Sequence, residues 1–146
     1  MRFKLIVDSE KEEEIVVTSH SANDFVAEIE KMVYSYNNPT ELLGYSDDAI
    51  LRLNLSEIEC ITVIDRRTYA LMNDGNRYRI NDTLTAIEER LPSYFIRINK
   101  SAIANEREIK YFKTTFSGAV DAVFKSGYRE YISRRCFVQI KRRFGI

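Results

Sequence analysis

The chain has 146 residues, of which 45 % are hydrophobic and 30 % charged, which suits one folded domain with a small extension and excludes global disorder. Lys and Arg together number 22, as do Asp and Glu, and this balance argues against a uniformly basic nucleic-acid binder. No apolar run approaches the length of a transmembrane helix, and the N-terminus has no apolar core typical of a secretory signal. The only two cysteines, Cys60 and Cys136, suggest no disulfide framework, so we expect a reducing cytoplasm.

The zero net charge is the sum of two opposite charges. Residues 1–91 contain 10 basic and 18 acidic residues, whereas residues 92–146 contain 12 basic and 4 acidic ones. The two segments therefore carry net charges of −8 and +8. Such asymmetry indicates a nucleic-acid or membrane contact at the basic end of the chain.

Residues 1–45 predict a small ββα extension. Apolar residues alternate with polar ones over 2–8 and β-branched residues fill 15–18, so both stretches predict strands. A helix is expected after Ser21, which is a good N-cap, because the next apolar residues follow helical spacing: Phe25, Ile29, Met32, Val33 and Tyr36. Residues 37–48, which are rich in Asn, Asp, Pro and Gly, predict a linker.

Residues 46–146 predict a mainly β domain with short helices, an α+β fold class that differs from a helix-turn-helix. One short helix is expected after Asp82 and another from Ser133 onward. Alternating or β-branched apolar stretches predict strands at 51–55, 58–64, 69–72, 77–80, 94–98, 109–113, 119–124 and 128–132.

The sequence offers no arrangement typical of an enzyme. His20 is the single histidine and precedes a helix start, where a surface position is expected. Cys60 lies in an apolar strand and Cys136 in a basic segment, with no second cysteine or histidine at a metal-ligand spacing. We therefore expect no catalytic residue, no cofactor and no bound metal.

Basic residues gather in three short clusters that also contain Asn, Ser or Thr, at 66–69, 97–101 and 133–135. This mixture suits DNA, because Lys and Arg neutralise phosphates, Ser and Asn bond phosphate oxygens, and Arg can bond guanine in the major groove. A helix that starts at Ser133 adds free backbone N–H groups for a phosphate. The alternative is that these side chains only cover solvent-exposed faces.

Residues 95–105, FIRINKSAIAN, followed by Ile109, resemble the signature segment of LytTR DNA-binding domains. Residues 131–135, YISRR, lead into the last helix as in that family, and residues 55–61 resemble its first strand. The resemblance extends over about residues 46–146. It implies a bacterial transcription regulator built from an elongated stack of small antiparallel sheets. In such a fold, loops rather than a recognition helix enter successive major grooves.

The resemblance also implies which side chains contact DNA. The candidate residues are Arg66, Arg67, Thr68, Asn99, Lys100, Ser101, Asn105, Arg129, Ser133, Arg134 and Arg135. Those expected nearest to base edges are Arg135, Lys100 and either Arg67 or Thr68. Those expected at phosphates are Ser101, Ser133 and Arg129. For Asn105 an alternative stays open, in which its side chain hydrogen-bonds its own backbone in a turn.

The implied partner is double-stranded DNA with promoter repeats. Many family members carry a phosphoacceptor receiver domain, but residues 1–45 are too few for that fold. Short members of this kind resemble response regulators that are controlled by a membrane-bound partner protein. The extension could instead support a homodimer through its apolar helix stripe. A protein-interaction module that docks through this helix, without DNA binding, is the alternative function.

Overall fold

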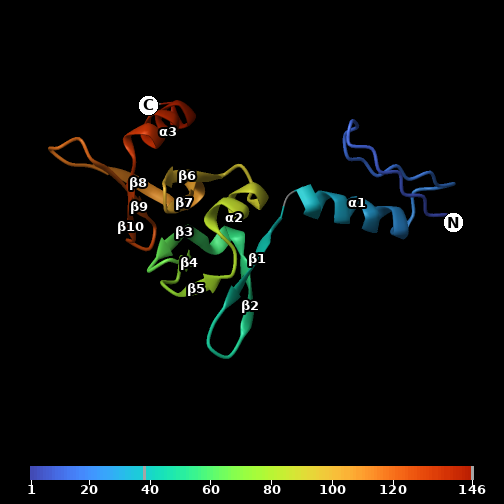
Figure 1. Cartoon of the computed structure of the whole chain (residues 1–146), viewed down its shortest axis with the longest axis horizontal. Coiled ribbons are helices and arrows are strands. Elements are labelled where there is room, and N and C mark those ends of the chain that lie inside the picture. Colours follow the sequence, from blue (N-terminus) through green and yellow to red (C-terminus); the bar gives the residue numbers. More distant parts are fainter. Residues whose placement is uncertain (38, 146) are drawn as a thin grey trace. The chain divides into compact units, whose positions relative to one another are not determined.

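The computed structural model describes residues 1–37 and 39–145, and the chain divides into two compact units (Figure 1). The N-terminal unit is Met1–Asn37 and the C-terminal unit is Asn38–Ile146. Asn38 in the predicted linker and Ile146 at the end of the predicted domain lie outside the described residues. The expected boundary at 45/46 therefore falls inside the second unit rather than between the two.

The N-terminal unit contains the expected helix but not the expected strands. Helix α1 spans Asp24–Asn37 and begins one residue after Asn23, whose Oδ1 accepts a hydrogen bond from the Val26 N–H at 3.0 Å. Asn23, not Ser21, is therefore the side chain that caps the helix. The strands predicted at 2–8 and 15–18 are wrong, because neither stretch pairs with another segment. The apolar side chains that alternate there are exposed, so they have no face to bury.

The C-terminal unit contains two antiparallel sheets. The larger has seven strands in the order β2-β1-β5-β4-β3-β7-β6. Its strands are β1 (Glu41–Tyr45), β2 (Ile50–Asn54), β3 (Ile58–Ile64), β4 (Arg67–Met72), β5 (Arg77–Ile80), β6 (Phe95–Asn99) and β7 (Ala102–Asn105). The smaller sheet has the order β10-β9-β8 and consists of β8 (Ile109–Thr114), β9 (Val120–Phe124) and β10 (Arg129–Ile132).

Two helices and two single turns of 3-10 helix complete this unit: α2 (Leu84–Arg90), α3 (Arg134–Phe144), η1 (Leu55–Glu57) and η2 (Glu106–Glu108). Thr83 caps α2 by accepting from the Ala86 N–H at 3.2 Å, so the cap is one residue later than the expected Asp82. The three helices of the described chain are separated from one another by strands. The expected mainly β fold class with short helices is confirmed.

Strand β1 lies where a linker was expected. Leu42 is buried in the core, and Gly44 sits so close to Leu53 that a Cβ atom at this position would lie 2.6 Å from the Leu53 Cδ1. Glycine therefore serves close packing here instead of a turn. The Asn, Pro and Gly residues around the strand conceal its short alternating pattern.

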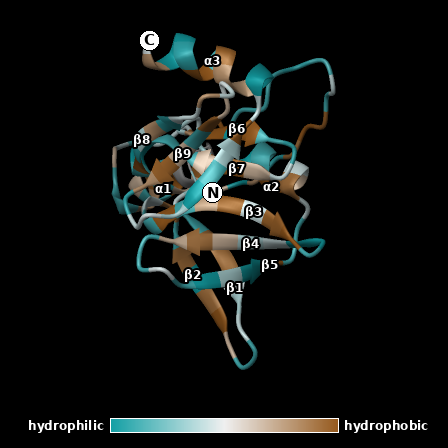
Figure 2. Cartoon of the chain, turned by 90° about the vertical axis from the view of Figure 1, so that its left-hand side faces the viewer, coloured by the Kyte–Doolittle hydropathy of each residue, from teal (hydrophilic) through white to brown (hydrophobic). Residues whose placement is uncertain are grey.

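Buried apolar residues form two clusters, one within the large sheet and α2 and the other between the large sheet, the small sheet and α3. Strand β3 contributes to both: Ile58 and Ile61 lie in the cluster of the large sheet, while Cys60 lies in the cluster shared with the small sheet and α3. This strand is coloured as predominantly hydrophobic along its length (Figure 2). Its burial on both faces explains why its sequence is a continuous apolar run rather than an alternating one. Strand β3 thus contributes side chains to both hydrophobic clusters.

Candidate nucleic-acid interface

The three basic clusters meet at one end of the C-terminal unit. The Val63 N–H, at the end of β3, donates to the Ser101 carbonyl in the β6–β7 turn at 2.9 Å. The Ser133 N–H, at the start of α3, donates to the Ile98 carbonyl in β6 at 2.8 Å. Backbone hydrogen bonds therefore join the β3–β4 turn, the β6–β7 turn and the start of α3 into one continuous edge.

The β3–β4 turn presents two arginines. Asp65 and Arg66 have φ angles of 50° and 66°, and Ile64 pairs with Arg67 across them, which defines a two-residue type I′ hairpin turn. Both Arg66 and Arg67 are exposed. Thr68, in contrast, is 8 % exposed and lies between neighbouring strands of the sheet. Its side chain therefore belongs to the sheet interior and is not presented for contact with a base.

The β6–β7 turn presents Lys100. Arg97 stabilises this turn, since its Nε donates to the Asn99 carbonyl at 2.8 Å and its Nη2 donates to the Lys100 carbonyl. The third guanidinium nitrogen of Arg97 pairs with Glu88 on α2. Lys100 and Ser101 are exposed at the turn. Arg97 is thus a support for the turn, while the Lys100 ammonium faces solvent.

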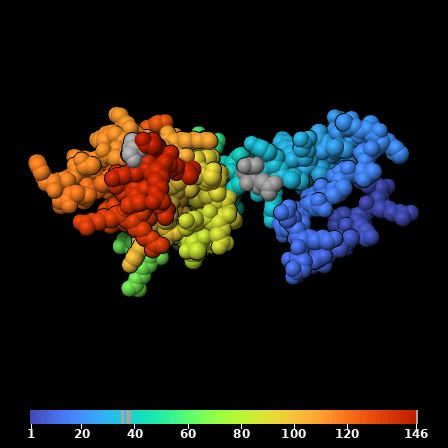
Figure 3. Space-filling view, turned by 90° about the horizontal axis from the view of Figure 1, so that it is seen from above, coloured from blue at the N-terminus to red at the C-terminus, as the bar shows by residue number. Residues whose placement is uncertain are grey.

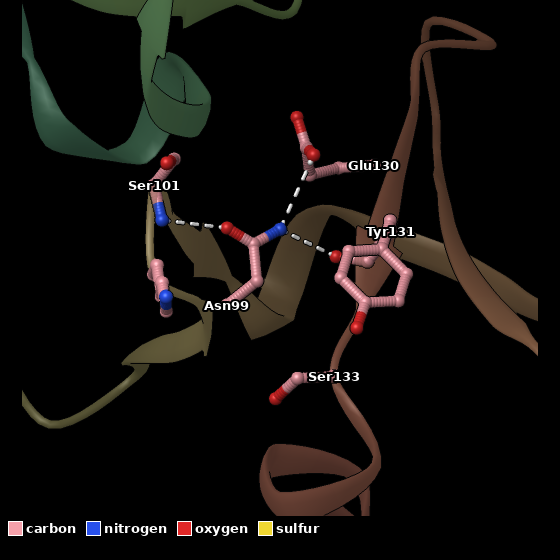
Figure 4. A pocket seen from close by; sticks show the side chains of 6 residues that line it. Asn99, Ser101, Glu130, Tyr131 and Ser133 are labelled. Atoms are coloured by element: carbon pink, nitrogen blue, oxygen red, sulfur yellow. Dashed lines mark hydrogen bonds between the residues drawn. The ribbon is translucent and has the colours of Figure 1, made fainter.

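Asn99 joins the two sheets and is itself buried, at 8 % exposure. Its Nδ2 donates to the Tyr131 carbonyl at 2.6 Å and to Glu130 Oε1 at 3.2 Å, and its Oδ1 accepts from the Ser101 N–H at 2.7 Å (Figure 4). Both N–H donors of the amide are used by these contacts, and its oxygen accepts one hydrogen bond. Asn99 therefore positions the Lys100 turn against β10 instead of offering a free side chain to DNA.

Asn105 also has an internal role. It is 1 % exposed, its Nδ2 donates to the Ile58 carbonyl at 2.9 Å, and its Oδ1 accepts from the Arg107 N–H at 3.0 Å. The second of these bonds caps the 3-10 turn η2, which agrees with the alternative of a turn-forming asparagine. Its bond to Ile58 reaches 47 residues back along the chain, which no local pattern indicates.

The start of α3 completes the edge. Ser133 caps the helix by accepting from the Cys136 N–H at 3.2 Å, as expected for a helix that begins at this residue. Arg134 and Arg135 in the first turn are exposed. Ser133, Lys100 and Ser101 line one pocket together with Asn99, Glu130 and Tyr131 (Figure 4).

The exposed cations at this edge form no ion pair with a carboxylate in the described part of the chain. Among residues 1–37 and 39–145, ion pairs hold Arg52, Arg90, Arg97, Lys125, Arg129 and Arg143. None holds the five exposed cations that we call the basic edge: Arg66, Arg67, Lys100, Arg134 and Arg135. The predicted phosphate contact Arg129 is paired with Asp121 at 2.9 Å. The basic edge therefore presents five exposed cations that form no ion pair within the described residues.

Two carboxylates that the sequence did not single out form hydrogen bonds within the C-terminal unit, Glu59 fully buried and Glu130 partly buried. Glu59 on β3 is fully buried and accepts from the Ser126 N–H at 2.8 Å and from the Ser126 hydroxyl. Glu130 accepts from the Tyr128 hydroxyl as well as from Asn99. The only sequence signal for Glu59 is its position as a charged residue inside an apolar run.

These contacts shift the titration of two neighbouring groups. Burial raises the pKa of Tyr128 well above its ordinary value, and the hydrogen bond to Glu130 raises it further. Burial likewise raises the pKa of the Cys60 thiol, with additional contributions from Glu130 and Glu59. Both groups therefore stay protonated and serve the packing between the sheets, as expected for a core cysteine.

Comparison with known proteins identifies this architecture. The family model of the LytTr DNA-binding domain matches residues 48–145. The C-terminal unit resembles a solved LytTr DNA-binding domain from a Bacillus cereus protein described as a methyl-accepting/DNA response regulator. That match has a TM-score of 0.69 at 19 % identity and covers 75 % of this chain and 100 % of that one.

Two relatives from Staphylococcus aureus match over the whole chain, including the N-terminal unit. The relative from strain MSSA476 is 30 % identical over 100 % of this chain and 99 % of its own length. The relative from strain MRSA252 is 29 % identical with the same coverage. Both are described as uncharacterized HTH-type transcriptional regulators. The helices described here, each separated from the next by strands, do not form a helix-turn-helix.

The fold is that of a β-rich DNA-binding domain. The chain belongs to the LytTr DNA-binding domain family. This membership supports DNA binding in transcription regulation and agrees with the predicted family. Within the described residues, no helix combines the length and apolar character needed to cross a bilayer. No group of acidic, Cys or His side chains there is arranged to hold a metal ion.

Proposed function

We propose that this chain binds specific double-stranded DNA sequences and thereby regulates transcription in the bacterial cytoplasm. The observation that carries this proposal is the basic edge, where backbone hydrogen bonds join three segments distant in sequence that together present five exposed cations without ion pairs. A row of unpaired cations favours a phosphate backbone, because each contact releases condensed counterions. The turns are narrow enough to enter a major groove that admits a helix or a two-stranded ribbon.

The exposed residues divide into two roles. We propose that Arg135, Lys100 and Arg67 read base edges from successive major grooves. Arginine and lysine both bond the acceptors of guanine there. Arg66, Arg134 and Ser101 contact phosphates, as does the N-terminal backbone of α3 at Ser133. Arg129 contributes less to binding, since its charge is partly compensated by the ion pair with Asp121.

The N-terminal unit supports a second role, in protein interaction. The buried apolar residues of the described chain begin at Leu42, whereas Phe3, Val7 and Met32 are 90 %, 88 % and 71 % exposed. A segment of this size without a core needs a partner to be stable. We propose that it forms a homodimer or binds a membrane-bound regulatory protein, and that its excess of acidic residues limits non-specific DNA binding.

Selection of bound sequences from random duplexes tests the main proposal. We expect enrichment of two repeats separated by about one helical turn, roughly 10 base pairs, because successive major grooves face the same side of the duplex. A chain that starts at residue 38 should select the same repeats and bind random DNA more tightly. An unenriched pool from the full chain contradicts sequence-specific binding. Unchanged affinity of the shortened chain for random DNA contradicts the role given to the acidic extension.

A further inference from the structure

The β8–β9 turn, residues 115–119, carries an aromatic side chain that touches nothing else in the molecule. Phe116 is 114 % exposed relative to a reference residue, the highest value among the large apolar side chains of the described chain. The turn around it is ordered by its own hydrogen bonds. The Gly118 N–H donates to the Thr115 carbonyl and the Thr115 N–H to the Ala119 carbonyl, each at 3.0 Å. The ring is therefore held away from the domain by a defined turn, which projects from the surface (Figure 3).

The hairpin arm that carries this ring is basic. Residues 109–120, which we call the β8–β9 arm, contain Lys110 and Lys113 and no acidic residue. Both lysines are exposed, and neither forms an ion pair within the described part of the chain. Apolar wedges presented beside basic side chains are a recurrent means of contacting duplex DNA. An isolated ring among Thr, Ser and Gly offers little of the contiguous apolar patch that protein docking requires.

Strand register places the arm's tip at the basic edge. Thr114, the last residue of β8, pairs with Val120, and Val120 pairs with Ile132, the residue before Ser133. The tip and the start of α3 are therefore at the same end of the small sheet, about 10 Å apart at two strand spacings. Asn99 donates a hydrogen bond to the Tyr131 carbonyl at this end as well, so the Lys100 turn, which follows Asn99, also lies there. In Figure 1 the β8–β9 turn and the start of α3 lie on the same side of the C-terminal unit.

We propose that the tip of the β8–β9 arm is a fourth DNA-contacting element, in which the Phe116 ring packs against bases at the flank of the bound site and Lys113 contacts a phosphate. This inference rests on the proposed function, since it requires a duplex along the basic edge. The Phe116 ring makes an apolar contact with the bases, in contrast to the electrostatic contact of Lys113 with a phosphate. Affinity that depends on Phe116 should therefore be independent of salt concentration, whereas affinity that depends on Lys113 should fall with salt.

The test compares full-length variants on the duplex selected by the wild-type chain. We expect Phe116→Ala to raise the Kd about tenfold, equivalent to about 1.4 kcal/mol, with the slope of log K against log salt unchanged. Phe116→Leu should retain part of the affinity. Lys113→Ala should reduce the slope by about 1. Ile50→Ala is the matched control, because Ile50 is also an exposed apolar side chain, at 66 %, but lies by the β1–β2 turn at the other end of the large sheet.

The outcomes separate the inference from the function on which it rests. Because Phe116 packs against nothing, its variants should unfold at the wild-type temperature, so a change in affinity is not a folding defect. Equal affinity of Phe116→Ala and the wild type for the selected duplex overturns the inference and leaves the proposed function intact. If Phe116→Ala and the control Ile50→Ala lose the same affinity, the inference is likewise overturned. A wild-type chain that selects no duplex refutes the proposed function itself.

Discussion

Replacement of Asn99 by alanine tests whether this residue builds the interface or contacts DNA. The substitution removes two donated hydrogen bonds, to Tyr131 and Glu130, and one accepted from Ser101. A buried polar group that loses its partner costs about 1–3 kcal/mol. Ser101 is exposed and Glu130 keeps the Tyr128 hydroxyl, so water and Tyr128 offset part of the loss. We therefore expect the free energy of unfolding to fall by about 2–3 kcal/mol.

Urea unfolding and DNA binding together provide the assay. The Asn99→Ala chain should show a lower urea midpoint and, under conditions where it is still folded, weaker binding to the selected duplex with an unchanged salt slope. Asn99→Asp should destabilise more, because it keeps the acceptor for Ser101 but places a carboxylate against Glu130. Wild-type stability of Asn99→Ala combined with relaxed base preference at one position would refute this reasoning and restore Asn99 as a direct contact.

Three further predictions concern the scaffold. Glu59→Ala should lower the free energy of unfolding by about 2–4 kcal/mol, because it leaves the N–H and the hydroxyl of Ser126 without their buried acceptor. Urea unfolding checks this, and Glu57→Ala, at an exposed position, is the control. Gly44→Ala should cost about 1–3 kcal/mol, since the new Cβ would lie 2.9 Å from the Tyr78 Cβ; a wild-type urea midpoint would contradict it. Burial and neighbouring carboxylates raise the pKa values of Cys60 and Tyr128 above their ordinary 9.0 and 10.0, so the unfolded chain loses these protons first. Stability should therefore fall as the pH rises above about 9, and Tyr128→Phe should lessen the fall above about pH 10.

Much of the C-terminal unit could be predicted from hydrophobic periodicity, because its strands bury one or both faces. The strand β3 and the helix that begins after Ser133 carry strong local signals, an apolar run and a cap, and both predictions are confirmed. The N-terminal strands show the limit of the same rule. Alternation at 2–8 indicates a segment able to pair, but pairing also needs a neighbour that the local sequence does not supply. At β1 the error was the opposite one, because a linker was predicted where a strand forms. The pairing of β1 with β2 outweighs the turn-forming residues around it.

The residues of the candidate site also fall into two groups, those that the sequence could identify and those that depend on contacts distant in sequence. Exposed cations in turns, such as Lys100 and Arg135, could be found from composition and family resemblance, since turns bring their side chains to the surface. The turn-forming role of Asn105 was among the alternatives, but the long-range bonds of Asn99 and Asn105 could not be found, because those partners lie 31 to 50 residues away. The burial of Thr68 was predictable in principle, since it shares a strand face with buried Ala70 and Met72 at a period of two.

The central claim is that the basic edge binds DNA, and the salt dependence of affinity for the selected duplex tests it most directly. The measurement compares two double variants: Arg66→Gln combined with Arg134→Gln in one chain, and Arg52→Gln combined with Arg77→Gln in another. The two double variants lose the same charge, but Arg52 and Arg77 lie on strands away from the edge. Each phosphate-neutralising cation contributes about 0.9 to the slope, so the first variant should lose up to about 1.8 of it, with an affinity loss of more than tenfold. The second should match the wild type. Equal slopes and affinities for the two double variants would contradict the account.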